Sequence, residues 1–266
     1  MGWKWALLFT LTALLASSGA GRAQQGNDPR VADLVQSGKV RVGLFLPQYT
    51  KDASSGELKG VWAESARALA ARIGVQLVLV EHPTPPQAIA CLKAGACDLL
   101  FLPFDERSAD VGDFSSPIFQ FDYTLLVPGN SAIQRVVDAD RSGTKIAAVR
   151  NHASTAELSR LLKQAELAHA ETPDRTFELL RDGQASAMAS ARPTLLGYAR
   201  RLTGSRVLED RYGANINRIV VPKGKAAWLA YVSEFVETAK ASGVVRTAIE
   251  RGGPPGVTVS PPGDPK

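Results

Sequence analysis

Short apolar runs alternate with amphipathic segments in the first half of the chain, and this alternation limits the fold more than any other feature. The apolar runs are Val40–Leu46, Val75–Glu81 and Cys97–Pro103, which are rich in valine and leucine, as buried strands are. Between them, residues 60–74 and 85–95 carry apolar side chains at helical spacing, and each segment ends at a glycine. The order of strand, helix, strand, helix and strand predicts an α/β protein with parallel strands and helices on both sheet faces.

The pattern starts again in the second half of the chain. Strands are expected over 122–129, 144–149, 185–190, 206–209 and 216–224, and helices over 154–165, 176–183, 193–202, 226–242 and 243–252. No Pro/Gly-rich linker separates the two halves, so the sequence predicts two lobes joined by short crossing strands rather than tandem domains.

The boundaries of these lobes follow from where the pattern restarts. Lobe 1 is expected to be discontinuous, with residues 24–120 and 216–251, and lobe 2 to contain residues 121–215. Residues 252–266 are rich in proline and glycine, and the sequence predicts that this tail is disordered.

The first 23 residues have the pattern of a secretory signal peptide. Lys4 precedes the apolar run Trp5–Ala16, and small residues follow up to Ala23, where cleavage is expected. The apolar run is shorter than the roughly 20 residues that cross a bilayer as a helix, so no stable membrane insertion is expected. The pattern predicts an exported, periplasmic protein.

The charge pattern gives no support for a nucleic-acid partner. The formal net charge is +5, of which Lys4 and Arg22 in the signal peptide supply two. The remaining basic residues are scattered, without a cluster or interleaved aromatics.

No cofactor motif is present. The three histidines, His82, His152 and His169, lack a metal-ligand spacing, so no metal site is expected.

Two cysteines stand six positions apart. In an oxidising compartment, an even number of closely spaced cysteines favours a disulfide between Cys91 and Cys97. The alternative is a pair of small buried thiols.

Arg107 stands among four carboxylates directly after an apolar run, in "DLLFLPFDERSADVGDFSSP". It is either an exposed residue paired with these acids or the contact for an anionic small molecule. Ligands of open parallel sheets bind beyond the carboxyl ends of the strands. Two facing units would therefore form one cleft from four loops, which are residues 46–50, 102–107, 150–154 and 190–193.

Several phrases in a fixed order make the chain similar to a known family. They include "GELKGVWAESARALAARIG", "DERSADVGDFSSPIF", "KIAAVRNHAST" and "LLRDGQASAMAS". With these phrases the chain resembles the bacterial extracellular solute-binding proteins of the amino-acid type, family 3. The resemblance implies a type II periplasmic-binding-protein clamshell, in which each lobe is a mixed, mostly parallel sheet flanked by helices. It also implies a monomer that presents a small solute to the permease of an ABC-type importer.

The resemblance assigns candidate ligand contacts. Arg107 matches the family's arginine that pairs with the ligand carboxylate. Asn151, His152, Ala153 and Ser154 match the loop whose backbone N–H groups hold the same carboxylate.

The departures from the family pattern are informative. Phe45 and Ala191 stand where amino-acid binders usually carry the acids that hold the ligand ammonium, and Leu100 and Leu102 replace small polar residues. Burying an ammonium without a carboxylate costs several kcal/mol, so an ordinary α-amino acid fits poorly. Tyr49 is the aromatic residue with the best claim to the cleft. Arg150 and Arg192 flank cleft loops and are either ligand contacts or solvated.

The sequence therefore predicts a binding protein for a small anionic or carboxylate-bearing solute, and not an enzyme. One alternative is an enzyme of the cyclohexadienyl-dehydratase type on the same scaffold, for which Glu64, His82 and His152 are the evident acid or base candidates. The other alternative is an accessory or sensory binding module.

Overall fold

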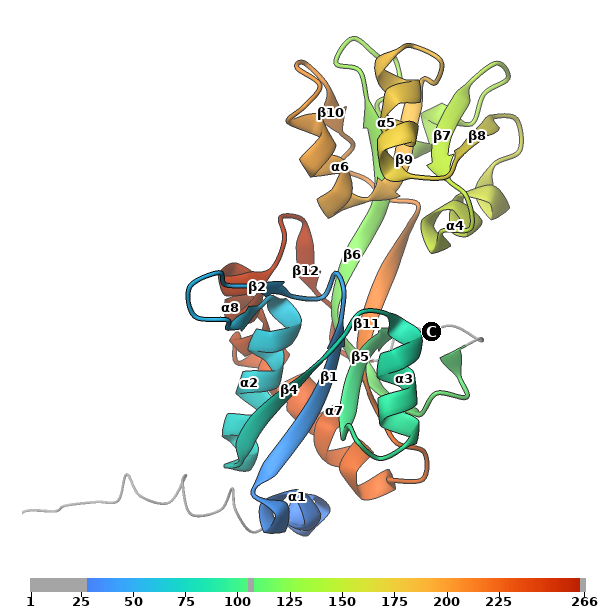
Figure 1. Ribbon diagram of the computed structural model, residues 1–266. Helices are drawn as coiled ribbons and strands as arrows, with labels where there is room; N and C mark the ends of the chain where they lie inside the picture. Colours follow the sequence, from blue (N-terminus) through green and yellow to red (C-terminus); the bar gives the residue numbers. More distant parts are fainter. Residues whose placement is uncertain (1–27, 105–107, 264–266) are drawn as a thin grey trace, which may run out of the picture.

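Two α/β lobes joined by two long strands make up the protein (Figure 1). The computed structural model describes residues 28–104 and 108–263. The predicted signal peptide and Arg107 therefore lie outside the described residues. The two-lobed α/β architecture that the sequence predicts is confirmed.

Lobe 1 is built on three parallel strands. Strand β1 (Lys39–Phe45) lies between β4 (Gln76–His82) and β5 (Leu99–Pro103) and pairs parallel with both. Helix α2 (Val61–Ile73) connects β1 to β4, and α3 (Pro85–Lys93) connects β4 to β5. The strand–helix alternation predicted from the apolar runs is present.

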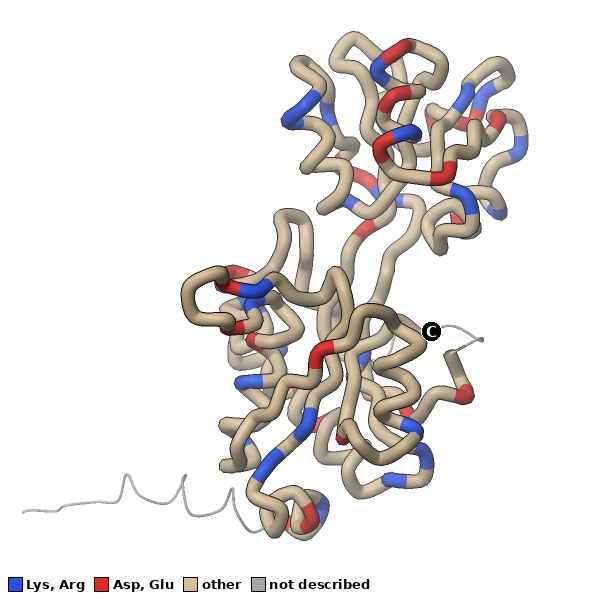
Figure 2. The backbone as a smooth tube through the Cα atoms, viewed as in Figure 1, with Lys and Arg blue, Asp and Glu red and all other residues tan. Residues whose placement is uncertain are grey.

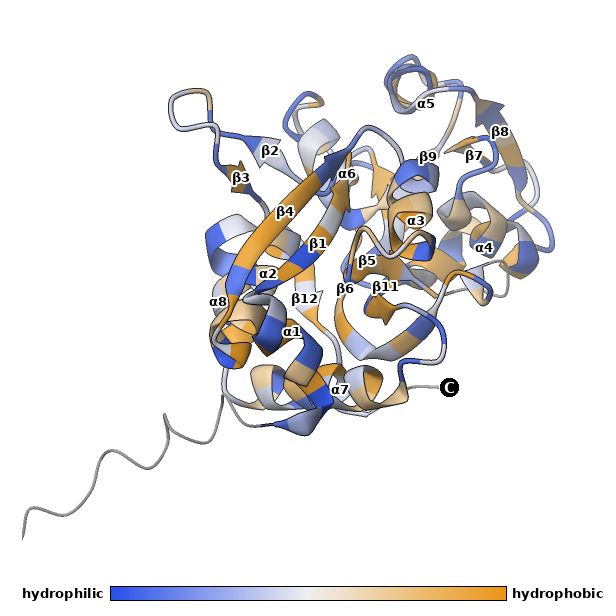
Figure 3. Ribbon diagram, turned by 60° about the horizontal axis from the view of Figure 1, so that its bottom comes forward, coloured by the Kyte–Doolittle hydropathy of each residue, from blue (hydrophilic) through white to orange (hydrophobic). Residues whose placement is uncertain are grey.

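Successive residues of these strands pack on opposite faces of the sheet. Leu99 and Phe101 join a cluster with α2, α7 (Ala226–Ala241) and α8 (Val244–Gly252), whereas Leu100 and Leu102 join a cluster with α3. Because neighbouring residues of a strand point to opposite faces, the sheet is buried on both sides. Figure 3 shows the strands of this lobe mostly in hydrophobic colours, with helices of mixed hydropathy around them.

Lobe 2 repeats the plan with a smaller sheet. Strand β7 (Lys145–Val149) pairs parallel with β8 (Glu166–Ala170) and with β9 (Ala187–Ala191). The helices of this lobe are α4 (Ala153–Leu161), α5 (Pro173–Arg181) and α6 (Arg192–Ala199).

Two antiparallel strands run through both lobes. Strand β6 (Asp113–Val127) pairs with β9 of lobe 2, and β11 (Gly213–Val221) pairs with β5 of lobe 1. The two strands also pair with each other from Asp113–Val221 to Tyr123–Gly213. The sheet order is therefore β4-β1-β5-β11-β6-β9-β7-β8. The residue boundaries assigned to the lobes from the sequence stay a prediction.

The remaining elements are short. They are η2 (Pro29–Val31), α1 (Ala32–Ser37), β2 (Thr50–Lys51), β3 (Leu58–Lys59), η4 (Val136–Ala139), β10 (Arg206–Val207) and β12 (Val257–Val259).

The helix predicted over 154–165 is shorter in the structure. Helix α4 ends at Leu161, and β8 begins at Glu166. The cause is Asp140, whose carboxylate accepts hydrogen bonds from the backbone N–H groups of Lys163, Gln164 and Ala165 at 2.7–3.0 Å. These bonds lower the pKa of Asp140 and hold the turn that the apolar periodicity had assigned to a helix.

The prediction of a disordered tail is wrong for the described part of the tail. Val257–Val259 forms β12, which pairs antiparallel with Phe119–Phe121 of β6. The apolar residues Val257 and Val259 pack on the main core of lobe 1, so burial outweighs the proline and glycine content around them.

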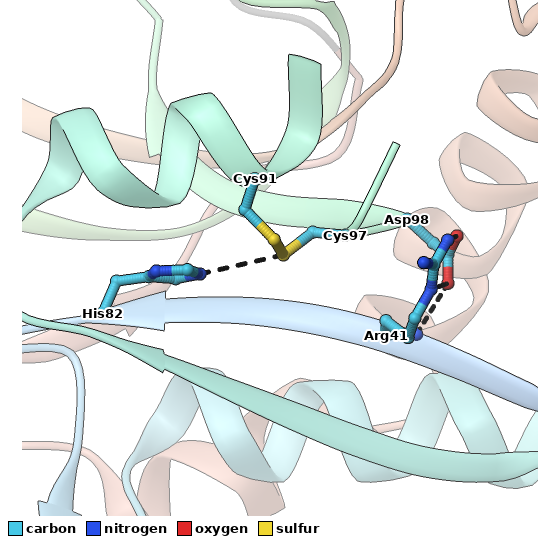
Figure 4. Close-up of a disulfide and its surroundings, with 5 residues drawn as sticks. All are labelled: Arg41, His82, Cys91, Cys97 and Asp98. Atoms are coloured by element: carbon cyan, nitrogen blue, oxygen red, sulfur yellow. Dashed lines mark hydrogen bonds and ion pairs between the residues drawn. A yellow bond between two sulfur atoms is a disulfide. The ribbon is translucent and has the colours of Figure 1, made fainter. Parts of the chain in front are cut away.

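The predicted disulfide is present. Cys91 of α3 and Cys97 before β5 are joined with their Cα atoms 5.3 Å apart, and His82 Nε2 lies 3.8 Å from Cys97 Sγ (Figure 4). In the same view, Asp98 accepts hydrogen bonds from the backbone and the guanidinium of Arg41. These contacts fix the start of β5 against β1.

Charged residues of both signs are spread over the two lobes (Figure 2). Across residues 28–104 and 108–263, no helix is long and apolar enough to cross a membrane.

We expect no free thiol in the exported protein after denaturation without reductant, because Cys91 and Cys97 are bridged. Thiol titration with and without reductant measures this, and finding two thiols without reductant would contradict the assignment. Reduction should lower the free energy of unfolding by about 2–3 kcal/mol, because the closed loop is short.

Candidate functional site

A cavity of about 800 Å³ opens at the carboxyl ends of the lobe 1 strands. Its size is typical of pockets for small molecules. The residues that line it come from the ends of β1 and β5, from α2 and α3, and from the two long strands. They are Phe45, Pro47, Gln48, Trp62, Pro85, Pro86, Ile89, Leu102, Pro103, Ser108, Val111, Phe121, Asn215 and Asn217.

A second cavity of about 550 Å³ shares one wall with the first. Pro47, Gln48, Trp62 and Phe121 line both. The second cavity extends to lobe 2, where it is lined by the residues at the end of β9 and the start of α6, namely Ala191, Pro193 and Thr194. The two cavities together form the candidate site, and we call them the cleft.

The loop after β1 is held in place by Gln48. The side-chain amide of this buried residue donates to the Phe101 carbonyl at 2.8 Å, and its oxygen accepts from the Phe45 N–H at 3.3 Å. Gly60 makes the close approach of this loop possible. It has a φ of 146°, and a Cβ atom there would lie 2.6 Å from the Gln48 carbonyl oxygen.

Trp62 is fixed from the side of the long strands. Its indole N–H donates to Asn217 Oδ1 at 3.2 Å, and Asn217 Nδ2 donates to Asn215 Oδ1 at 2.8 Å. The Trp62 ring meets Phe119 edge-on at 5.6 Å and is tilted against Phe121 at 5.7 Å between centroids. This wall of the cleft is therefore aromatic and has a set orientation.

Two tyrosines lie where the long strands enter lobe 2. The rings of Tyr123 and Tyr212 are 6.0 Å apart. Burial raises the pKa of both phenols, and a hydrogen bond from Asn215 offsets this in part at Tyr123. Both phenols therefore stay neutral at physiological pH. Tyr49, which lines the second cavity, also has a raised pKa, first through burial and then through the nearby Glu81 carboxylate.

The lobe 2 residues assigned from the family stand at the start of α4. Asn151 adopts a left-handed φ of 61°, His152 is the N-cap, Ala153 begins the helix and Ser154 is buried. None of the four lines either cavity of the cleft as it stands in this structure. Figure 1 shows α4 at the edge of lobe 2 nearest to lobe 1.

The arginines named from the sequence differ in their surroundings. Arg107 lies outside the described residues. Arg150 is exposed and forms an ion pair with Glu171 at 2.8 Å. Arg192 lies 3.6 Å from the Asp122 carboxylate and donates to the carbonyls of Leu208 and Glu209 at 2.8 Å. Arg192 thus holds lobe 2 together and is not a solvated loop residue.

The other predicted residues divide between the cleft and the core. Phe45 and Leu102 line the first cavity, and Tyr49 and Ala191 line the second. Leu100 is fully buried under α3. Glu64 is paired with Arg67 beside α8, and His82 contacts the disulfide, so neither of these acid–base candidates lines the cleft.

The sequence interpretation missed part of the cleft. Trp62 has the spacing of a core residue, and it is only 9% exposed, yet it lines both cavities. Asn217 lies in the predicted strand 216–224 and Asn215 directly before it. Their two-residue spacing, which puts both on one face of β11, was the available signal.

Most of the chain matches the sequence model of one protein family. Residues 41–251 match the sequence model for bacterial extracellular solute-binding proteins, family 3.

A curated relative from Bordetella bronchiseptica, the virulence sensor protein BvgS, is 28% identical over 166 residues. The match covers 61% of this chain but only 13% of the much longer sensor.

Solved structures share the fold at low identity. A putative binding component of an ABC transporter from Wolinella succinogenes, complexed with lysine, is 22% identical with a TM-score of 0.63, over 81% of this chain and 95% of its own. An ancestral cyclohexadienyl dehydratase is 22% identical with a TM-score of 0.59, over 83% and 95%.

We expect Asn217→Ala to lower the free energy of unfolding by about 1–3 kcal/mol, because the buried indole N–H of Trp62 loses its acceptor. Urea denaturation measures this, with Asn130→Ala at an exposed position as the control. A change as small as that of the control would show that the hydrogen bond contributes little.

Proposed function

Because this chain belongs to the bacterial extracellular solute-binding proteins, family 3, we propose that it captures a small carboxylate-bearing solute in its cleft. We further propose that it works in the periplasm after removal of residues 1–23, and that it presents the solute to the permease of an ABC-type importer.

The composition of the cleft supports a solute without a free ammonium group. Among the described residues that line the two cavities, none is an aspartate or a glutamate, and the single charged residue is Lys59. Lys59 is paired with Asp52 at 2.6 Å on the exposed β2–β3 hairpin. An ammonium that leaves water needs a carboxylate partner, and the described lining offers none.

The carboxylate contact is proposed to come from two sources. Arg107 follows β5, and its position in the family phrase assigns it to the anion. The N-terminus of α4, with Asn151–Ser154, would supply backbone N–H groups from lobe 2. Since these four residues stand outside both cavities here, they would reach the solute when the lobes close.

A sensory role is the second candidate, and one observation favours it. The curated relative with 28% identity is a virulence sensor protein, and the match lies within 13% of its length. A sensory module would bind its solute in the same cleft. It would differ from a transport protein only in the partner that recognises the closed form.

An enzymatic role has less support. An ancestral cyclohexadienyl dehydratase shares the scaffold, but Glu64 and His82 do not line the cleft, and His152 lies at the start of α4. General acid–base catalysis needs such a group within hydrogen-bond reach of the substrate.

A thermal-shift screen of carboxylates, amines and amino acids tests the proposal. A bound solute stabilises the folded state by RT ln(1 + [L]/Kd), so a binding protein unfolds at a higher temperature with its solute. Stabilisation by ordinary α-amino acids, with none by acids that lack the ammonium, would contradict the proposed class.

We expect Arg107→Ala to weaken binding of the carboxylate found in this way by about 2–5 kcal/mol, because the ligand anion loses its charged partner. Arg107→Lys should restore only part of the affinity, since an ammonium cannot form the bidentate contact. Calorimetric titration measures both variants, with Arg160→Ala on the exposed face of α4 as the control. Normal affinity in Arg107→Ala would assign Arg107 to a surface ion pair.

A further inference from the structure

The first cavity of the cleft is suited to an uncharged group. Apart from four prolines, its walls are Phe45, Trp62, Ile89, Leu102, Val111 and Phe121 on the apolar side, and three amides and Ser108 on the polar side. None of the described residues that line it is charged.

The amides in the wall already have partners. Gln48 is bonded through both ends of its side chain to Phe101 and Phe45. Asn217 accepts from Trp62 and donates to Asn215. A charged group that entered the cavity would lose its hydration without gaining a counter-charge from the described part of this wall, and that loss is costly. The described lining therefore favours an uncharged group.

The aromatic wall favours a ring. The Trp62 and Phe121 rings are inclined at 53° with centroids 5.7 Å apart, and Phe45 is nearly buried at the end of β1. Flat aromatic groups gain from offset or edge-to-face contacts with such rings in addition to the burial of apolar area.

We propose that the first cavity binds an uncharged ring, so that the solute class is aryl-substituted monocarboxylic acids rather than amino acids or short-chain acids. This inference rests on the proposed function, which supplies the carboxylate. The ring would occupy the lobe 1 side of the cleft, and the carboxylate would face the contacts proposed above.

Calorimetric titration with 3-phenylpropanoate, propanoate, phenylalanine and 3-phenylpropanamide tests the ring separately from the carboxylate. We expect the affinity for 3-phenylpropanoate to be at least about tenfold higher than the affinity for propanoate, because the ring is buried. Equal or tighter binding of propanoate would overturn the ring inference and leave the proposed function intact. Equal binding of the amide would overturn the carboxylate instead. Preference for phenylalanine would contradict the absence of an ammonium partner, and no binding by any of the four would overturn the ring inference.

A matched pair of variants localises the ring. Val111→Thr keeps the side-chain shape and places a hydroxyl in the first cavity, whereas Val137→Thr makes the same change at a side chain that is 62% exposed in lobe 2. We expect Val111→Thr to weaken 3-phenylpropanoate binding several-fold and to leave propanoate unchanged. Equal effects of the two variants, with both proteins folded by circular dichroism, would place the ring elsewhere.

A second inference concerns the segment that follows the family match, which ends at residue 251. We call residues 254–263 the strap. Its middle, Val257–Val259, pairs with Phe119–Phe121 of β6, on the side of β6 opposite to β11. The strap therefore adds a third strand at the crossing between the lobes, as Figure 1 shows for β12 beside β6.

A buried lysine anchors the strap to lobe 1. The Lys240 side chain of α7 is only 4% exposed, and its ammonium forms an ion pair with Glu237 at 2.7 Å. The same ammonium donates to the carbonyls of Pro117 in β6 and Pro261 in the strap, at 3.1 and 2.9 Å. Glu237 also accepts from the Gly263 N–H at 3.3 Å. One charged pair thus joins helix, crossing strand and strap.

The strap also touches lobe 2. Gly256 has a left-handed φ of 87°, and a Cβ atom at this position would lie 2.9 Å from Arg192 Cδ and 3.3 Å from Leu196 Cδ1 in α6. The strap is therefore fixed to lobe 1, paired with the crossing strand and in contact with lobe 2.

We infer that the strap restrains the angle between the lobes. A change of that angle has to bend β6 at the crossing, and it must carry β12 with it or break the ladder at Phe119–Phe121. Without the strap, two paired strands alone connect the lobes, and the range of angles should widen.

Spin labels at Ala71→Cys on α2 and Gln184→Cys in lobe 2 report this range as a distance distribution, since both positions are exposed. We expect a broader distribution after truncation behind Gly253 and in Lys240→Met, which removes the charge but keeps an apolar chain. Lys225→Met, at the exposed start of α7, is the control. Unchanged widths in both test variants, with the lobes folded by circular dichroism, would overturn the inference.

Discussion

The antiparallel pairing of β6 with β11 is the constraint on which the rest of the structure depends. Strand β6 takes part in the cores of both lobes and β11 in those of lobe 1, so moving the lobes apart would break a ladder that extends from Asp113 to Tyr123. A paired ribbon resists stretching but can bend and twist, because its hydrogen bonds run across the strands. The ribbon also supplies part of the site, since Phe121, Asn215 and Asn217 line the cleft from it. The element that connects the lobes is therefore also part of the wall of the candidate site.

The chemistry of the cleft follows from how its polar groups are used. In many binding sites, polar side chains have hydrogen-bonding groups that are available to the ligand. Here the side chains of Gln48 and Asn217 form hydrogen bonds with other residues of the protein. They hold a loop and an aromatic ring in place, and the surface that faces the solute is mostly apolar. In the proposed function, recognition of charge would fall to residues at the margins, namely Arg107 after β5 and the start of α4. With such a division, the walls would select the solute by its shape and the margins would select it by its charge.

The sequence predicted the architecture well, because strands buried on both faces leave strong apolar runs and the helices between them show clear periodicity. It failed where a distant side chain decides the local structure. Nothing near Leu162 indicates that Asp140 will bind the following N–H groups and end α4. Likewise, the composition of the tail gives no sign that Lys240, about twenty positions earlier, holds it. For the site, the family resemblance placed Phe45, Leu102 and Ala191 at the cleft, and its loop position placed Tyr49 there. Trp62 was interpreted as a core residue, because an almost buried side chain on a helix has the spacing of one. Arg107 lies outside the described residues, so its role stays a prediction.

The placement of Trp62 has a consequence for observing the protein. Two of the four tryptophans, Trp3 and Trp5, belong to the proposed signal peptide. The processed chain would keep only Trp62 in the cleft and Trp228, whose indole donates to the Asp98 carbonyl in lobe 1. One indole then lines the cleft and the other is held in the core of lobe 1. The protein contains its own optical reporter and reference, so occupancy of the cleft can be followed by intrinsic fluorescence without any added dye.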